Sequence, residues 1–297
     1  MKRFAKCAVA MIAALVVVGT VWAAQPVSER LPIGPGGEID IEVLSGTVTI
    51  EAWDKDVVEV TGTLGDGVEE LEFEGDEDGV WIEVVFDEEY HGRHEVETDL
   101  TIRLPGGTPL SVETVSASIS VTGVTGELDI ETVSGNIQIS SNPSALDVES
   151  VSGNIFVKSA PPESDLASVS GLIEIRAAGG LIDVENVSGE IMIHGGVIDG
   201  GDLETVSGDI TCQAIPGPGN DLDIQTMDGA ITLVVDPTMI ASFELSTFSG
   251  SIDNQIGPEP RRTSKYTPGK ELSFNTGTGG PSISLESFSG TIKLMTR

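Results

Sequence analysis

Cysteine is scarce in this 297-residue sequence, which contains only Cys7 and Cys212. Cys7 lies in an N-terminal segment that we expect to be removed, so no internal disulfide is expected. Packing and backbone pairing must therefore stabilise the fold. Cys212 falls in a column of aliphatic residues described below, which predicts a small buried hydrophobe rather than a reactive thiol.

Positive charge is also scarce, because 15 Lys and Arg residues stand against 48 Asp and Glu, a formal net charge of −33. A chain this acidic repels nucleic acid instead of binding it through released counterions. Much of the positive charge lies in "PEPRRTSKYTPGK", which contains Arg261, Arg262, Lys265 and Lys270. This segment is either a solvated loop or a contact site for an acidic surface.

Aromatic residues make up only 4% of the chain, which argues against a sugar site built on ring stacking. Histidine is rarer still, and His91, His94 and His194 do not recur with any serine, so no serine–base pairing is indicated. His91 and His94 lie among glutamates in "DEEYHGRHE". Residues three apart point to opposite faces of a strand, so this segment does not indicate a transition-metal site.

A long apolar run occurs only at the N-terminus. Lys2, Arg3 and Lys6 precede the apolar residues 8–18, and small residues follow near Ala23 in "VWAAQ". This layout is typical of a secretory signal peptide, and the run is short for a membrane span. We predict a signal peptide at residues 1–23, export to the periplasm or cell surface, and no membrane span after cleavage. An uncleaved N-terminal anchor is the alternative.

The sequence is rich in one internal repeat. "ETVSGNIQIS" at residues 131–140 returns as "ESVSGNIFVKS" and as "ASVSGLIEIRA". Such self-similarity is the first guide to the fold. Alignment on the glycine of the Ser-Gly pair gives ten copies, at Gly46, Ala117, Gly135, Gly153, Gly171, Gly189, Gly208, Gly229, Gly250 and Gly290.

The aligned copies share apolar columns. The residues five before and two before the glycine are apolar in all ten copies, and the residue two after it is Ile in every copy except Val48. Period-two alternation predicts strands on both sides of the glycine. The alternation breaks between the positions five before and two before, so we expect a corner there, where glycine can adopt φ > 0.

One such unit cannot bury its apolar residues alone, but units stacked about 4.8 Å apart can. The sequence therefore predicts an all-β fold, a single parallel β-solenoid of ~18–21-residue coils with Val and Ile columns inside. The expected organisation is an N-terminal β region at residues 24–107 and solenoid repeats at 108–297. Residues 57–100 form a β-meander that is inserted between the first coils or caps them, and a hairpin is inserted at about residues 253–281.

Two polar columns accompany the repeat. Serine precedes the glycine in nine of ten copies, and a Thr/Ser/Asn column lies two residues before that serine. We interpret both columns as structural, because short polar side chains at a corner can bond free backbone groups. Ser recurring in this way is not a catalytic nucleophile, and we predict no catalytic residue and no cofactor.

A glutamate column lies four residues before the glycine. Like charges stacked about 4.8 Å apart cost energy unless cations or protonation relieve them. Glu131, Glu149, Glu185 and Glu204 are therefore candidate ligands for weak Ca²⁺ binding, although no EF-hand loop specifies a tight site. The alternative is a solvated acidic face.

Three segments carry a resemblance to a known family. "PIGPGGEIDIEVLSGTVTIEAWDKDVVEV", "TIRLPGGTPLSVETVSASISVTGVTGELDIETVSGNIQI" and the terminal "GTGGPSISLESFSGTIKL" resemble the bacterial putative adhesin family, the β-strand-repeat domain of unknown function numbered 4097. The resemblance extends from about residue 31 to residue 297. It implies a β-solenoid protein of the cell envelope, and the family offers no catalytic residues to carry over.

The expected function is a non-enzymatic adhesion or interaction scaffold whose partner is an envelope protein or a glycan. Long solenoid faces suit such extended partners. Two alternatives stay open at this point. One is a polysaccharide-active β-helix enzyme, which needs two suitably placed carboxylates. The other is a self-assembling envelope scaffold built by stacking coil ends.

Overall fold

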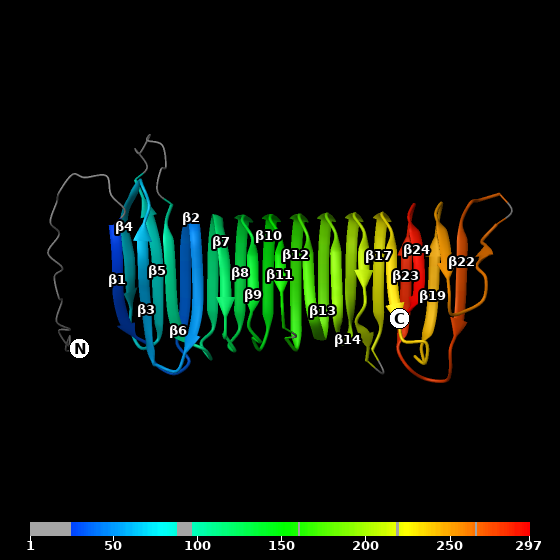
Figure 1. Ribbon diagram of the computed structural model, residues 1–297, viewed down its shortest axis with the longest axis horizontal. Helices are drawn as coiled ribbons and strands as arrows, with labels where there is room; N and C mark the ends of the chain where they lie inside the picture. Colours follow the sequence, from blue (N-terminus) through cyan, green and yellow to red (C-terminus); the bar gives the residue numbers. More distant parts are fainter. Residues whose placement is uncertain (1–24, 88–96, 160, 218–219, 265) are drawn as a thin grey trace, which may run out of the picture.

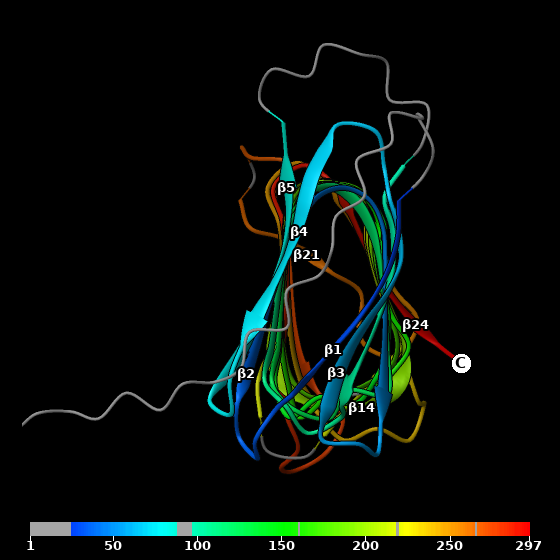
Figure 2. The same cartoon turned by 90° about the vertical axis from the view of Figure 1, so that its left-hand side faces the viewer.

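The computed structural model describes residues 25–87, 97–159, 161–217, 220–264 and 266–297. In these residues the chain contains no helix, and its 24 strands form one sheet that winds into an elongated rod (Figures 1 and 2). The predicted all-β class is confirmed. The predicted signal peptide and the pair His91 and His94 lie outside the described residues. Within the described part of the chain, no helix is long and apolar enough to cross a membrane.

The middle of the rod consists of parallel strands in matching register. Leu146 lies opposite Leu128 and Ser164, so successive strands pair residues 18 positions apart. The same pattern continues towards the C-terminus, where one step lengthens to 21 residues between Leu203 and Ile224. The strands of this part are β7 (Leu110–Thr122), β8 (Leu128–Ser134), β9 (Ile137–Ser140), β10 (Leu146–Ser152), β11 (Ile155–Val157), β12 (Glu163–Ser170), β13 (Ile173–Ser188), β14 (Ile191–Ser207), β15 (Ile210–Cys212), β16 (Ile215–Pro216), β17 (Leu222–Asp228) and β18 (Ile231–Val235).

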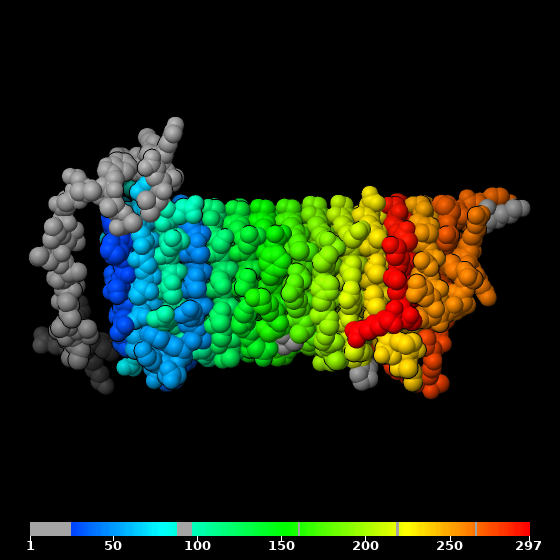
Figure 3. Space-filling model, viewed as in Figure 1, coloured from blue at the N-terminus to red at the C-terminus, as the bar shows by residue number. Residues whose placement is uncertain are grey.

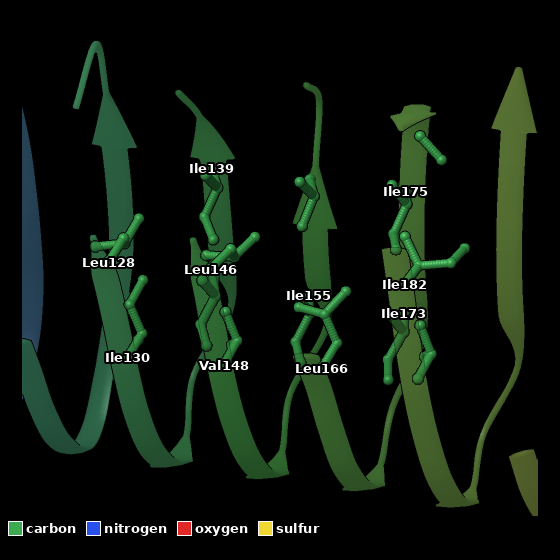
Figure 4. Close-up of a cluster of buried hydrophobic side chains, with 14 of the residues drawn as sticks. Leu128, Ile130, Ile139, Leu146, Val148, Ile155, Leu166, Ile173, Ile175 and Ile182 are labelled. Carbon is green, nitrogen blue, oxygen red and sulfur yellow. The ribbon is translucent and has the colours of Figure 1, made fainter. Parts of the chain in front are cut away.

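The core is a set of aliphatic columns that run along the rod (Figure 4). Ile137, Ile155 and Ile173 pair in adjacent strands, and each is fully buried. Cys212 lies in the same kind of column, between Ile193 and Leu233, and is also fully buried. Its predicted place as a small buried hydrophobe is confirmed by this burial, which also raises the pKa of the thiol to about 11.

The prediction about where the alternation breaks is wrong. Burial continues past the position five before the glycine to the polar position three before it, so Thr132 is 5% exposed while Val133 is 49% exposed. The Thr/Ser/Asn column therefore points inward and the apolar column beside it points outward. The physical reason is that the corner's backbone groups need partners: the Thr132 hydroxyl, for example, donates to the Ser134 carbonyl oxygen at 3.2 Å.

The Ser-Gly pair is structural, as predicted. The Ser152 hydroxyl donates to the carbonyl oxygen of Val133 in the neighbouring coil at 3.2 Å, and Ser134, Ser170 and Ser188 make the equivalent bond. Gly153 has φ +139°, and a Cβ there would lie 1.9 Å from the Gly135 carbonyl oxygen. Close stacking of coils, as much as backbone conformation, therefore requires glycine at this corner.

The N-terminal end of the rod is covered by the strands β1 (Gln25–Pro32), β2 (Glu38–Trp53), β3 (Val57–Leu64), β4 (Val68–Gly75), β5 (Gly79–Phe86) and β6 (Asp99–Pro105). Strand β2 pairs directly with β7, with Gly46 opposite Ala117, so the intervening residues do not separate the first two copies. Strands β5 and β6 pair with the outer edge of β2, and antiparallel β1, β3 and β4 extend this layer. Of the two placements that the sequence left open for this segment, the structure has the cap. The predicted meander is wrong, because β3 pairs with β1 and β6 and not with its neighbour in the chain, β4.

The C-terminal end contains β19 (Ser242–Thr247), β20 (Ser251–Asn254), β21 (Arg261–Arg262), β22 (Lys270–Asn275), β23 (Ser282–Ser287) and β24 (Thr291–Thr296). Stacking in chain order, which the repeat suggests, fails here, because β23 lies between β17 and β19. The following strand β24 lies in the same way between β18 and β20, and Figure 3 shows it as the red C-terminal strand between the yellow and orange segments. Antiparallel β22 then covers the exposed edge of β19, and Phe243 and Phe274 stack with ring centres 5.0 Å apart.

Candidate binding groove

An exposed apolar column runs along the whole rod. Its members stand two residues before the repeat glycine, and their exposed fractions lie between 44% and 58%. We call this column the apolar stripe; its members are Leu44, Val115, Val133, Val151, Val169, Val187, Val206, Met227, Phe288 and Phe248. Contiguous exposed apolar surface of this kind marks interaction sites in soluble proteins.

The apolar stripe lines a groove of about 1440 Å³ that extends from the coil of β2 to the coils of β19 and β23. The groove is open. Each of its ten coils contributes the residues four and two before the glycine, and nine of the ten also contribute the residue three before it. Small-molecule pockets are typically about 300–1,000 Å³. The groove's size and its course along the rod suit an elongated partner better than a small ligand.

Carboxylates run beside the apolar stripe. We call the position four before the glycine the glutamate row; its carboxylates are Glu42, Glu113, Glu131, Glu149, Glu185, Glu204 and Glu286. Two residues further back, on the same outward face, lies the aspartate row of Asp40, Asp129, Asp147, Asp165, Asp183, Asp202 and Asp223. The rod therefore presents parallel acidic and apolar lines on one face.

Partial burial, and then neighbouring carboxylates, raise the pKa of several of these side chains. The pKa of Glu131 lies above its usual value because of partial burial first and the neighbouring Glu113 and Glu149 second. The pKa values of Asp129, Asp147, Asp165 and Asp202 are raised in the same direction, again by partial burial and then by adjacent carboxylates. The face therefore carries unrelieved negative charge, which a cationic partner would relieve.

The two ends of the groove differ. Near β2, strand β5 adds Glu83 and Phe86 to the lining, so carboxylates are dense there. Towards the C-terminal end, Gln225 and Ser246 replace two glutamates. The stripe there consists of larger side chains, and Phe248 and Phe288 stack with ring centres 4.8 Å apart. One end is thus mainly acidic and the other mainly apolar.

The candidate Ca²⁺ ligands fall into two pairs. Glu131 lies opposite Glu149, and Glu185 lies opposite Glu204, while Ala167 stands between the pairs. In the described part of the chain, no three His, Cys, Asp or Glu side chains are grouped so that they could hold a metal ion. Weak Ca²⁺ binding by these four residues stays a prediction.

Sequence reasoning did not find the groove, although a signal for it was present. The position two before the glycine shares its parity with the two acidic rows, so it lies on the charged, outward face of the strand. Hydrophobicity alone predicts that every apolar column lies in the interior, and this column is the exception. The polar residue between two apolar ones, such as Thr132 between Ile130 and Val133, was the deciding clue.

Comparison with known proteins shows the family to which this chain belongs. The model of the family Toastrack DUF4097 matches residues 37–295. The chain belongs to this family. Membership accounts for the repeat over nearly the whole described chain, and it confirms the resemblance inferred from the sequence. A search of curated proteins finds no match.

Solved structures share the Toastrack fold at low sequence identity. A protein from Parabacteroides distasonis described as a putative adhesin is 14% identical, with a TM-score of 0.57 over 92% of this chain and 98% of its own. A second protein from that organism, described as a putative lipid binding protein, is 17% identical, with a TM-score of 0.50 over 91% of this chain and 96% of its own. At these identities the likeness shows the fold alone.

Proposed function

We propose that this protein is an exported, non-enzymatic interaction scaffold of the cell envelope, with an adhesion role and with the groove as its contact surface. The observation that carries the proposal is the apolar stripe. A folded rod needs apolar residues only at its inward positions, so ten outward apolar residues in line require another reason, and partner contact supplies one.

The proposal assigns each part of the chain a role. Residues 1–23 direct export, and the mature chain is a single parallel β-solenoid with coils of about 18–21 residues that presents the groove at constant spacing. The caps at both ends support a free-standing rod, because they cover strand edges that would otherwise invite end-to-end growth. The description of a structural neighbour as a putative adhesin is consistent with this role.

The electrostatics of the groove favour a scaffold over a glycan-cleaving enzyme. A general acid and its partner carboxylate need environments that push their pKa values apart. Beside the groove, the pKa values of Asp129, Asp147, Asp165 and Asp202 are all raised, first by partial burial and then by neighbouring carboxylates, so these four aspartates share one kind of environment. Regular repetition produces equivalent carboxylates, which suits an extended contact surface.

Export is tested by fractionating cells that produce the full chain and a variant without residues 1–23. We expect the full chain in the envelope or medium, shortened at its N-terminus, and the truncated chain inside the cell. Full-length chain that remains inside the cell would contradict the localisation.

Binding is tested with immobilised mature chain and solubilised envelope from the organism that produces the protein. We expect capture of a defined envelope component, and loss of that capture when Val133, Val151 and Val169 are all replaced by threonine, which keeps the β-branched shape. A chelator arm tests the predicted role of Ca²⁺. Capture that is unchanged in the triple variant, or no capture at all, would contradict the groove as the contact surface.

A further inference from the structure

We propose that the occupant of the groove is a basic amphipathic α-helix from a partner protein, an inference that rests on the proposed function and specifies its partner. The apolar face of this helix would lie on the apolar stripe, and its Lys and Arg residues would lie against the glutamate row. Three features of the groove lead to this assignment: its satisfied backbone, its spacing and its charge.

The backbone beneath the groove has no free edge. Strand β10 pairs with β8 on one side and β12 on the other, and β17 pairs likewise with β14 and β23. An extended peptide could not add to the sheet here, since strand addition needs an unpaired edge. A partner must therefore bring a backbone whose hydrogen bonds are already made, and an α-helix does so.

The spacing of the stripe suits a helix. Adjacent coils place one apolar side chain every ~4.8 Å along the rod. A helix lying along the rod advances about 5.4 Å per turn and presents one or two apolar residues per turn on one face. The ten coils span roughly 43 Å at this spacing, the length of a helix of about 29 residues.

The charge of the groove selects a cationic helix. Within the described residues, the ion pairs of the chain involve Glu51, Glu59 and Glu174, and none involves the glutamate row. Among the described residues these carboxylates have no ion-pair partner, and lysine or arginine on a partner would supply the counter-charge. The same charge repels anionic lipids, and it repels a second copy of this chain, whose net charge is also −33.

The test uses synthetic peptides and the mature protein. The probe is a helix of about 24 residues, roughly 36 Å long, with leucine on one face and lysine on its flanks. One control peptide carries glutamate in place of lysine, and another has the same composition in scrambled order. We expect saturable binding of the leucine–lysine helix only, and a gain in its helicity on binding.

Paired variants locate the binding site. We expect V133T/V151T to weaken binding of the leucine–lysine helix by about tenfold. The matched control, V197T/I215T, changes exposed apolar residues outside the groove and should leave binding unchanged. This pair tests the apolar contact.

A second pair tests the charge. E131Q/E149Q should weaken binding by roughly tenfold at low salt and reduce its salt dependence. E127Q/E163Q removes the same charge from exposed positions outside the groove, and its effect should be less than about twofold. Circular dichroism of each variant checks that the fold is retained.

Several results would overturn the inference. Equal loss of binding in the groove and control variants would show diffuse attraction to an acidic protein. Equal binding of the scrambled peptide would exclude a helix-specific site. Binding to neutral phosphatidylcholine vesicles that V133T/V151T abolishes, with no peptide binding, would assign the groove to lipid. Dimerisation lost in the same variant would assign it to a second copy. Envelope capture by the unaltered mature protein with no peptide binding would overturn this inference alone. If the unaltered protein captured no envelope component at all, the proposed function would be overturned too.

Discussion

Two apolar columns of the same strands differ in burial: one lies in the core and the other lies on the surface. Five residues before each glycine, side chains such as Val148 are fully buried, while two residues before it Val151 is 49% exposed. Both columns are apolar in all ten copies. The first is explained by folding, since inward positions of a stacked coil must be apolar. Folding does not explain the second column, because its side chains point outward. A repeated apolar position in a sequence can therefore indicate a contact surface as well as a core.

The largest effect is expected at the corner that separates the two strand segments of a coil. In Gly153→Ala the new Cβ would lie 1.9 Å from the Gly135 carbonyl oxygen at a backbone φ of +139°. We expect the free energy of unfolding to fall by about 3 kcal/mol or more, measured by urea denaturation. Gly107→Ala, whose Cβ meets nothing within 4 Å, should change it by less than about 1 kcal/mol. Similar values for the two variants would contradict the close stacking.

The two columns themselves are compared by truncating one valine in each. Val148→Ala opens a cavity in the core and should lower the free energy of unfolding by about 2–3 kcal/mol. Val151→Ala removes the same atoms from the apolar stripe and should lower it by only about 0.5 kcal/mol. The check is chemical denaturation of both variants. If Val151→Ala cost as much as Val148→Ala, the stripe would belong to the core.

The polar column between them should show an intermediate effect. Thr132 accepts a hydrogen bond from the Thr114 hydroxyl at 2.8 Å inside the corner. Thr132→Val keeps the shape and leaves that hydroxyl without its acceptor, so we expect a loss of about 1 kcal/mol in unfolding free energy. Thermal denaturation measures it. If Thr132→Val were more stable than the unaltered protein, the inward hydroxyl would be destabilising and its hydrogen bond would not contribute to stability.

The smallest effect concerns pH and the acidic rows beside the stripe. The pKa values of Asp147 and Glu131 are raised in the fold above the ordinary values of these groups, first by partial burial and then by neighbouring carboxylates. The folded state therefore binds protons at a higher pH than the unfolded chain does, and stability should rise as pH falls from neutral through these folded pKa values. Thermal midpoints between pH 7 and about 4 test this. In Asp147→Asn the thermal midpoint should rise less as the pH is lowered. A thermal midpoint that falls over this whole pH range would contradict the raised pKa values.

The sequence was sufficient to predict the repeated parts of the fold. Alternation predicted strands, and the recurrence of Ser-Gly predicted stacked corners, because each copy must satisfy the same constraints. The non-repeated parts were less predictable. The insertion of β23 between β17 and β19 depends on which edge is free when the C-terminal segment docks, and no local pattern encodes that.

The groove was missed for a different reason. Judged by hydrophobicity alone, Val133 and Ile130 are expected in the core and Thr132 on the surface. The alternation of side chains along the strand instead puts Ile130 and Thr132 on the inner face and Val133 on the outer face. Inward hydroxyls can be favoured at a corner because the backbone there lacks partners, as the bond from Thr132 to Ser134 illustrates. The stripe can be located by counting in steps of two from the charged residues, because these positions share the outward face of the strand.

Thiol labelling of the mature protein tests the opposite placement of the two columns most directly. Cys212, which is fully buried, serves as an internal reference and should not react with a thiol reagent under native conditions. Val151→Cys should add one thiol that reacts at once, and Val148→Cys should add one that reacts only in denaturant. A protected thiol at residue 151, or a reactive one at residue 148 in the folded protein, would contradict the outward stripe and with it the groove.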